Sequence, residues 1–325
     1  MQREITSLFG QNKVILRQTE RPVTPYGGIA VFAAYLNKIG YREAIGKFMP
    51  IQLTSPNAIN PVETFTAFMV SVLAGARRFA HVGLLRFDKA LHCILGIGRF
   101  PTHDTIRNLF KRFNQAKVYQ FYSQILEWQI LRLPERGQGY SLDLDSTVFE
   151  RYGQQQGAVK GYNPKKHGRP SHHPLLAVLG EAHFVLHAWL RSGNCGPSRG
   201  VVEFLKEALA HLGTRLRIRV IRADSGFFDH ELLSFLEARN LPYIVVARLT
   251  RWIKQEAANV QEWKALDSTY SVGEFRKKLY GWDHERRIVV VREKLSEKPS
   301  VGRRLLTVPG YTFRLFVTTL SDPPE

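Results

Sequence analysis

The chain has 325 residues, and 44% of them are hydrophobic, which is enough for one large buried core or two modest ones. A folded chain is therefore expected rather than a disordered one. Lysine and arginine number 46 against 28 aspartates and glutamates, so the formal net charge is +18. Because this excess is spread along the chain rather than confined to a tail, it favours a polyanionic partner.

The sequence also disfavours a membrane protein or a secreted protein. No apolar run approaches the roughly 20 residues needed to span a bilayer, and the first residues lack the apolar core of a secretory signal. We therefore expect a cytoplasmic protein. Cys93 and Cys195 are the two cysteines, and they form no Cys-x-x-Cys pair, so a disulfide framework or structural zinc site is disfavoured. Any bound metal needs oxygen ligands.

Residues 1–137 are predicted to form a basic, helical, DNA-binding domain, because apolar side chains recur there at three- and four-residue spacing. Within it, residues 82–115 resemble a helix-turn-helix. One apolar stripe predicts the first helix, and a glycine-bearing turn at 96–98 follows it. The stripe consists of Leu84, Phe87, Leu91 and Ile94.

The second helix of this segment is predicted to begin after Pro101, with Thr102 as its N-cap. Its apolar face consists of Ile106, Leu109, Phe110 and Phe113. Its opposite face carries Arg107, Lys111 and Arg112, which suits a helix that contacts phosphates on one side. An ordinary helical hairpin with a solvated basic face has the same pattern, and this segment alone leaves both interpretations open.

Residues 138–248 are predicted to form an α/β core, because the periodicity changes to two at Tyr140 after a linker. Residues 173–180 and 183–191 predict an antiparallel strand pair. Helix, strand, helix and strand follow, with Ser198 and Asp229 as the expected N-caps and strands at 216–223 and 243–247. This order predicts a mixed sheet with helices around it. Residues 249–325 are predicted to be a β-rich insertion with strands at 275–282, 286–292 and 311–319.

Two aspartates in the first predicted strand of the core are the leading candidates for chemistry. In a strand, Leu142 and Leu144 face one way while Asp143 and Asp145 face the other. Like charges this close resist joint ionisation unless a cation compensates them. A Mg²⁺ ion, which prefers one or two carboxylates together with water and phosphate oxygens, supplies that compensation. The alternative is a solvated pair at a loop edge.

A third aspartate has a matching context. The predicted strand at 216–223 runs into Asp224, Ser225 and Gly226, and open α/β sheets place ligand groups at such strand ends. Asp224 could equally be a turn former. If Asp145 lies on a neighbouring strand, the two carboxylates together favour the metal-binding interpretation of Asp224.

A basic loop lies between these two strands. It combines cations, one aromatic side chain, glycines and prolines, a composition that suits contacts along a DNA backbone with the tyrosine free to stack. The candidate DNA-binding residues are Lys160, Tyr162, Lys165, Lys166 and Arg169. A solvated loop is the alternative, and the histidines at 167, 172 and 173 are not at ligand spacing with any acid or cysteine.

Four segments together resemble the DDE transposases of bacterial insertion sequences, whose catalytic core is ribonuclease H-like. They are Leu-Asp-Leu-Asp-Ser-Thr at 142–147, Gly-Tyr-Asn-Pro at 161–164, Arg-Ser-Gly-Asn at 191–194 and Ala-Asp-Ser-Gly-Phe at 223–227. The resemblance covers residues 140–247. It implies a ribonuclease H-like mixed sheet with flanking helices.

The resemblance also implies roles for individual residues. Asp145 and Asp224 match the first two catalytic, metal-binding carboxylates, and Asp143 and Thr147 are expected to support the site. Two Mg²⁺ or Mn²⁺ ions are implied beside the scissile phosphate. The implied partners are double-stranded DNA, namely the inverted repeats of the element and its target, and a second copy of the chain in a homodimer.

One part of the family's pattern is missing. Its third acid stands in a Tyr-x-x-Arg-x-x-x-Glu helix, whereas Tyr280 is followed three residues later by Asp283 and no third carboxylate is identified. Glu285 and Glu293 lie in strand-like sequence, and Glu325 is the last residue. We therefore expect the chain to stop before this acid and its strand transfer to be impaired.

Two alternatives remain at this stage. Residues 143–147 also resemble the opening motif of haloacid-dehalogenase-type phosphatases, with Asp143 as the nucleophile and Asp145 as the acid/base. The basic helical domain and the antiparallel strand pair disfavour this assignment. The other alternative is a DNA-binding remnant without catalysis, which shares the fold and the partner of the first interpretation.

Overall fold

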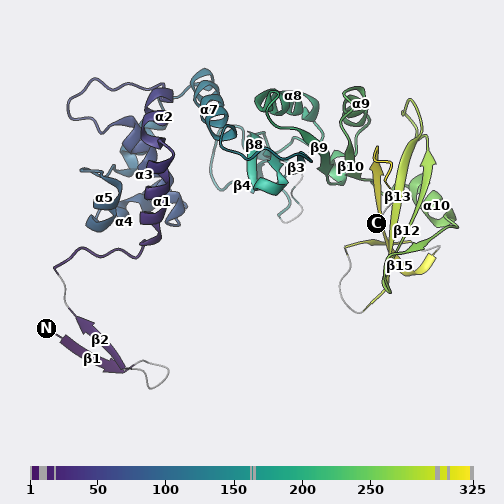
Figure 1. Cartoon of the computed structure of the whole chain (residues 1–325), viewed down its shortest axis with the longest axis horizontal. Helices are drawn as coiled ribbons and strands as arrows, with labels where there is room; N and C mark the ends of the chain where they lie inside the picture. Colours follow the sequence, from purple (N-terminus) through teal and green to yellow (C-terminus); the bar gives the residue numbers. More distant parts are fainter. Residues whose placement is uncertain are drawn as a thin grey trace. The chain divides into compact units, whose positions relative to one another are not determined.

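The chain divides into two compact units, residues 1–131 and 132–325 (Figure 1). The structure is a computed structural model. It describes residues 2–6, 13–17, 20–161, 163, 166–296, 301–305 and 308–322, the first two ranges by their backbone alone. Within these residues, every helix is too short or too polar to span a bilayer.

The first unit is helical after an N-terminal hairpin. The hairpin pairs β1 (Gln2–Thr6) antiparallel with β2 (Lys13–Arg17). The helices that follow are α1 (Gly28–Lys38), α2 (Tyr41–Phe48), α3 (Pro61–Leu73), α4 (Val82–Leu85), α5 (Lys89–Leu95), α6 (His103–Phe110) and α7 (Gln115–Ile130).

Polar caps set where several of these helices begin. The side chains of Asn60, Asp88, Thr102 and Asn114 accept hydrogen bonds from backbone N–H groups in the first turns of α3, α5, α6 and α7. These groups have no partner inside a helix, so each cap contributes on the order of 1 kcal/mol. The predicted N-cap at Thr102 is confirmed.

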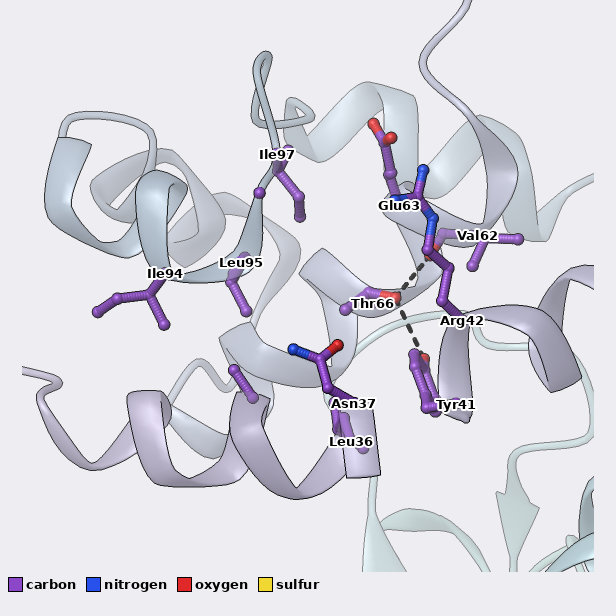
Figure 2. Close-up of a pocket in the computed structure, with 12 residues that line it drawn as sticks. Leu36, Asn37, Tyr41, Arg42, Val62, Glu63, Thr66, Ile94, Leu95 and Ile97 are labelled. Atoms are coloured by element: carbon purple, nitrogen blue, oxygen red, sulfur yellow. Dashed lines mark hydrogen bonds between the residues drawn. The ribbon is translucent and has the colours of Figure 1, made fainter. Parts of the chain in front are cut away.

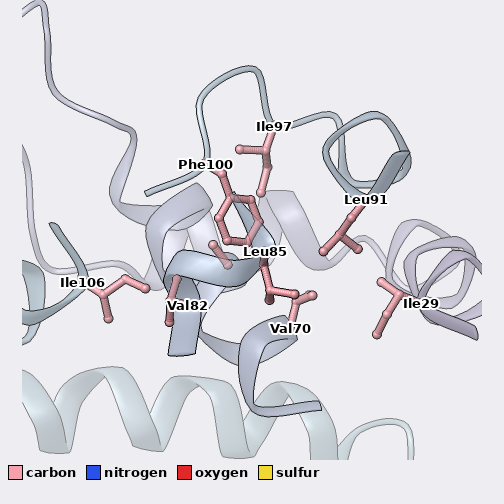
Figure 3. Close-up of a cluster of buried hydrophobic side chains, with 9 residues drawn as sticks. Ile29, Val70, Val82, Leu85, Leu91, Ile97, Phe100 and Ile106 are labelled. Carbon is pink, nitrogen blue, oxygen red and sulfur yellow. The ribbon is translucent and has the colours of Figure 1, made fainter. Parts of the chain in front are cut away.

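Hydrophobic clusters hold the described helices of this unit together. The first gathers Ile29, Val70, Leu91 and Ile106 with their neighbours from α1, α3, α5 and α6 (Figure 3). The second packs α1 and α2 against Leu109 and α7. Ile106 and Leu109 are buried as predicted, whereas Phe110 and Phe113 are half-buried.

The predicted apolar stripe at 84–94 is wrong in its first half. Leu84 and Phe87 are 73% and 85% exposed. The reason is local, because Asp88 caps α5 and thereby separates it from the single turn of α4. The direction of the apolar face therefore changes between the two helices, and only Leu91 and Ile94 contribute to the cluster.

A small pocket of about 120 Å³, lined by polar and apolar side chains, opens among α1, α2, α3 and α5 (Figure 2). At its wall the Tyr41 hydroxyl lies 3.2 Å from the Thr66 hydroxyl, which donates to the carbonyl oxygen of Val62 at 2.7 Å. Burial raises the pKa of Tyr41, although the Thr66 contact opposes this. The two hydroxyls thus bond within the unit and contribute to its packing.

The second unit is built on one ten-stranded mixed sheet. Its order is β11-β12-β13-β15-β10-β9-β3-β7-β8, and β14 pairs with β15 outside this path. The strands are β3 (Tyr140–Ser146), β7 (Leu175–Leu179), β8 (Phe184–Trp189), β9 (Ile218–Ala223), β10 (Tyr243–Val246), β11 (Lys264–Ala265), β12 (Tyr270–Lys277), β13 (Arg286–Lys294), β14 (Arg303–Leu305) and β15 (Val308–Thr318).

The directions of these strands match the predicted mixed sheet. Strands β3, β7 and β8 pair antiparallel in succession, and β9 and β10 then add parallel to β3 on its other side. Strand β15 pairs antiparallel with β10. The β-rich segment after residue 248 therefore continues the same sheet, because β10 offers it an edge to pair with.

The α-helices in the described part of this unit are α8 (Val201–Leu212), α9 (His230–Ala238) and α10 (Arg251–Asn259). Asp229 caps α9 as predicted, with its carboxylate accepting from the N–H groups of Glu231 and Leu232. The predicted cap at Ser198 is wrong. Helix α8 begins instead after Gly200, whose φ of 70° is in the left-handed region that favours glycine.

The first predicted strand of the insertion is also displaced. The structure has β12 at Tyr270–Lys277, so residues 278–282 belong to the turn at 278–285 that joins it to β13. Gly281 lies at φ 82° in this turn, and Tyr280 is fully exposed. Of the aromatic residues that suggest a strand here, Phe275 lies in β12, whereas Tyr280 and Trp282 lie in the turn.

A buried ion pair ties α9 to β13. The Arg286 side chain is 1% exposed and donates to both carboxylate oxygens of Glu237 at 2.7 and 2.8 Å. The Tyr243 hydroxyl donates to the same carboxylate, and Trp282 lies under the guanidinium. Burial raises the pKa of Glu237, but the hydrogen bonds from Arg286 and Tyr243 outweigh it, and the pKa lies below its ordinary value.

Arg286→Met is expected to lower the free energy of unfolding by about 3 kcal/mol, because it leaves the Glu237 carboxylate part-buried without its main partner. Urea denaturation followed by circular dichroism measures this. Lys278→Met removes an exposed cation nearby and is the control. Equal stability of the two variants would contradict the importance of the pair.

A second network joins α8 to β8. His187 is buried, stacks on Phe204 with ring centroids 4.8 Å apart and contacts the Glu207 carboxylate at 2.9 Å. Trp189 donates to the same oxygen. Burial lowers the pKa of His187 below the usual 6.5, and the contact with Glu207 only partly opposes this.

We therefore expect stability to fall as the pH decreases through 6.5. Below that pH the unfolded chain binds a proton at His187 that the folded chain resists, so protonation favours unfolding. The urea midpoint of His187→Phe should fall less between pH 7 and pH 5 than that of the unchanged chain. His167→Phe changes an exposed histidine and should follow the unchanged chain. Identical pH profiles for all three proteins would refute the assignment.

Candidate metal and nucleic-acid site

Two parallel strands bring Asp145 and Asp224 to the same edge of the sheet. In the register of β3 and β9, Leu144 pairs with Ala223. The next residue on each strand is the aspartate. Since parallel neighbours in register run about 4.8 Å apart, the two aspartates lie side by side at the strand ends.

An ion pair two residues earlier identifies the face of the sheet that they share. Asp143 of β3 pairs in register with Arg222 of β9, and the guanidinium donates to both carboxylate oxygens at 2.6 and 2.7 Å. Side chains two residues further along each strand face the same way. Asp145 and Asp224 are therefore on the face that carries this ion pair. The hydrogen bond to Asp143 raises the pKa of Arg222.

Both aspartates are exposed, and local backbone groups orient them. One oxygen of Asp145 accepts from the N–H of Ser146 at 2.7 Å, and one oxygen of Asp224 accepts from the N–H of Gly226 at 2.8 Å. Asp224 thereby caps the short turn Ser225–Phe227. The turn-forming and the metal-binding interpretations of Asp224 are thus compatible, because one carboxylate oxygen can serve each.

The turn after Asp224 is fixed from a neighbouring strand. Arg248, just beyond β10, donates to the carbonyl oxygens of Ser225 and Gly226 at 2.8 and 3.0 Å. A Cβ atom at Gly226 would meet Pro197 at 2.8 Å, so the turn is also closely packed. Sequence analysis missed Arg248, because only the pairing of β9 with β10 brings it to this turn.

The donor set fits a hard divalent cation. Two carboxylates on one face at adjacent strand ends are the kind of oxygen ligands that Mg²⁺ and Mn²⁺ take beside water and phosphate. Across the described part of the chain, no group of three or more His, Cys, Asp or Glu residues could hold a metal. The absence of a third carboxylate partner remains a prediction, since Glu325 lies outside the described residues.

Asp143 and Thr147, the expected supporting residues, have different surroundings. Asp143 is engaged with Arg222, so it acts on the relative position of β3 and β9. Thr147 is exposed, and its N–H donates to the carbonyl of Pro174 at 3.4 Å.

A small basic sheet follows Asp145 directly. It consists of β4 (Phe149–Glu150), β6 (Pro170–His172) and β5 (Val159–Lys160), in that order. Because β4 continues from β3 and β6 leads into β7, this sheet stands at the end of the strand that carries Asp145. Lys160, Lys166 and Arg169 are exposed on it or beside it, whereas Tyr162 and Lys165 lie outside the described residues.

Tyr152 is an aromatic residue of this region that sequence analysis missed. It is 71% exposed, and both Lys166 and Arg169 lie within 5.5 Å of its ring centroid. Its hydroxyl donates to Glu150 and accepts from Lys166. Because Lys166 and Arg169 lie more than ten residues further along the chain, only the fold brings them to Tyr152.

Two glycines of the predicted motifs meet backbone to backbone. A Cβ atom at Gly161 would lie 1.8 Å from the carbonyl oxygen of Gly193, and one at Gly193 would lie 2.4 Å from the carbonyl oxygens of Val159 and Ser171. Buried Arg191 supports this contact by donating to the carbonyls of His173, Gly196 and Arg199. These motif residues therefore join the basic sheet to the loop after β8.

The predicted cations of the helical unit are exposed. Arg107, Lys111 and Arg112 all face solvent at α6 or just beyond it. Arg107 pairs with Asp104 one turn earlier, at 2.5 Å. Their contact with DNA remains a prediction.

Comparisons with known proteins place the chain in a class. It is a mixed α/β protein of the transposase type, because residues 6–321 match the family model described as transposase DDE domain, group 1. The chain therefore belongs to that family, which confirms the resemblance noted from its motifs. The family generally uses divalent metal ions.

The chain is also similar to solved structures. Among them is that of a piggyBac transposase in a synaptic complex with hairpin DNA, at 12% identity and a TM-score of 0.48. The match covers 94% of this chain and 64% of the other, so the chain spans less than two thirds of that transposase. No curated protein matches the chain.

A double-mutant cycle tests the pairing of Asp143 with Arg222. Because both side chains are part-exposed, we expect a coupling free energy of only about 0.5–1 kcal/mol between Asp143→Asn and Arg222→Gln. Urea denaturation of the two single variants and the double variant measures it. Additive effects would mean that the ion pair does not hold β3 to β9. A second double-mutant cycle, between the exposed Lys160 and Arg222, is the control and should show no coupling.

Proposed function

We propose that this chain is the transposase of an insertion sequence, with Asp145 and Asp224 as its catalytic, metal-binding carboxylates. The observation that carries the proposal is the parallel register of β3 and β9, which sets the two aspartates side by side on one face. The family match supports the same assignment. In the proposal, the chain binds terminal inverted repeats and catalyses strand cleavage and transfer.

The five strands β8, β7, β3, β9 and β10 are proposed to be the ribonuclease H-like catalytic core. Their support is the pattern of three antiparallel strands followed by two parallel ones joined through α8 and α9. Residues 1–137 are proposed to bind DNA, with residues 82–115 as the helix-turn-helix. Residues 249–325 are proposed to be the β-rich insertion, which here extends the sheet of the core.

We propose that the cations around Asp145 and Asp224 and those on α6 bind the DNA. The formal net charge of +18 supports a polyanionic partner. The small basic sheet supports contacts close to the chemistry, because its first strand, β4, follows directly on the strand that carries Asp145. Asp143 would position the site through Arg222. A homodimer is proposed, since two element ends must be cut together.

The protein's part in the reaction is binding and orientation. Asp145 and Asp224 would hold Mg²⁺ or Mn²⁺ at the strand ends, and the backbone N–H groups of Ser146 and Gly226 orient their carboxylates. The chemistry that such ions supply is activation of an attacking water or 3′-hydroxyl and stabilisation of the leaving oxygen. The basic sheet would hold the phosphate backbone in place.

Nicking of supercoiled plasmid in Mg²⁺ or Mn²⁺ tests the proposal. We expect nicking by the unchanged chain, and a loss of at least about 100-fold in Asp145→Asn and in Asp224→Asn, because each change removes one of two charged metal ligands. Mn²⁺ binding followed by electron paramagnetic resonance should weaken at least about 10-fold in the same variants.

The matched control is Asp267→Asn, which changes an exposed aspartate of the β11–β12 turn. Unchanged nicking in Asp145→Asn and Asp224→Asn would overturn the assignment. Salt-sensitive DNA binding without nicking or Mn²⁺ binding would favour a DNA-binding remnant. Hydrolysis of a phosphomonoester that is lost in Asp143→Asn would favour the phosphohydrolase alternative.

A further inference from the structure

The end of helix α3 reverses the chain through a tight glycine turn. The N–H of Gly75 donates to the carbonyl oxygen of Val72 at 3.0 Å, and the N–H of Ala76 donates to that of Ser71 at 2.9 Å. These two bonds are those of a Schellman motif, which needs a residue in the left-handed region, and Gly75 lies at φ 92°. The chain after Gly75 is therefore turned back towards α3.

That reversal leaves a pocket of about 330 Å³ between the end of α3 and residues 76–82, which we call the α3 pocket. Its volume lies within the range of ligand-binding pockets, about 300–1,000 Å³. Val72 and Phe79 line it and are exposed, so its apolar surface is open to water. A docked apolar group would remove that surface from water, which is favourable. The apolar residues of its lining are Phe68, Val72, Ala76, Phe79 and Val82.

Aromatic contacts fix the shape of the α3 pocket. The centroid of the Phe79 ring lies 6.0 Å from that of Phe68 and 6.3 Å from that of Phe110, and the centroids of Phe68 and Phe110 are 4.9 Å apart. Rings from α3, the 3₁₀ turn Phe79–His81 and α6 thus pack on one another. The pocket is therefore preformed, which lowers the entropic cost of binding there.

The charge at the α3 pocket is positive. Arg77 and Arg78 line it and are exposed, and its described lining contains no acidic side chain. Neither guanidinium forms an ion pair with any residue that the structure describes. The carbonyl oxygens of Ser71 and Val72, at the negative end of α3, already accept hydrogen bonds within the turn. The two cations are therefore available to an anionic partner.

An apolar pocket beside free cations fits an apolar group that an acidic chain carries. A DNA backbone would pair with the arginines but leave the apolar lining in water, because the surface of a duplex is charged. A protein segment with carboxylates around a phenylalanine or leucine uses both features, since the apolar side chain enters the pocket and the carboxylates pair with the guanidinium groups. A second copy of this chain fits less well, because its formal net charge is +18.

We propose that the α3 pocket docks an acidic segment of another protein through one phenylalanine or leucine side chain. Phe68 and Phe79 contact this apolar anchor, and Arg77 and Arg78 pair with the carboxylates beside it. The helical unit thereby has a protein-binding surface at the end of α3, in addition to the DNA contacts proposed for α6. The contact forms whether or not the sheet of the second unit holds a metal.

Fluorescence anisotropy with labelled peptides tests this contact. The probe is a short peptide of aspartate, glutamate and serine with one central phenylalanine, and the matched peptide has alanine in its place. The unchanged chain should bind the phenylalanine peptide at least about ten-fold more tightly, because buried aromatic anchors carry most of the binding free energy at such contacts. Ala76→Trp fills the pocket and should remove this preference. Val72→Glu places an acid at an exposed position of α3 and should do the same without any change to the packed interior.

The arginines are tested by the Arg77→Gln/Arg78→Gln double variant. It should bind the phenylalanine peptide about three- to five-fold more weakly, because two exposed charge pairs are lost, and its affinity should depend less on NaCl concentration. The matched control is Lys38→Gln/Lys47→Gln, which removes two exposed cations from α1 and α2 of the same unit. This control should keep the affinity of the unchanged chain.

Equal affinity of the unchanged chain for the two peptides would overturn the proposal, as would equal losses in the arginine variant and its lysine control. Duplex DNA is the competing ligand for the same cations. Loss of duplex binding in Arg77→Gln/Arg78→Gln with peptide binding unaltered would assign the arginines to DNA and refute the docking. The peptide assay contains neither metal nor DNA, so its result is independent of the nicking assay.

Discussion

The parallel pairing of β3 with β9 is the constraint on which the candidate site depends. The two strands are about 80 residues apart in the chain, as the separation of 79 between Asp143 and Arg222 shows. Their ion pair favours one register, and a slip of one residue would turn every side chain of a strand to the other face. Asp145 and Asp224 would then no longer share a face. The chemistry proposed for the chain thus rests on a backbone alignment that other side chains stabilise.

Much of this arrangement could be predicted from the sequence, because its signals are local. The alternation of leucine and aspartate at 142–145 predicted the buried and exposed sides of β3, and the structure has Leu142 and Leu144 buried with Asp145 exposed. Thr102 and Asp229 were correctly predicted as caps, since both lie directly before helix-forming segments. Asp224 could be placed at a strand end for the same reason.

The wrong predictions and the missed residues depend on features that a short stretch of sequence does not show. The stripe at 84–94 fails because one aspartate, Asp88, caps a new helix within it. Ser198 has the side chain of a good cap, yet Gly200 supplies the left-handed backbone that α8 needs at its start. Arg222, Arg248 and Tyr152 take their importance from partners that lie far along the chain or in another loop. Sequence alone shows these residues as cations and a tyrosine without indicating what they contact.

The contact between Gly161 and Gly193 has a consequence for how the basic sheet behaves. Main chain touches main chain there, so no side-chain rotamer at either glycine can lengthen or shorten the gap. The distance from the basic sheet to the loop after β8 is consequently set by peptide geometry, which ionic strength leaves unaltered. Salt can weaken the attraction of these cations for phosphate, but it leaves the spacing between the basic sheet and that loop intact.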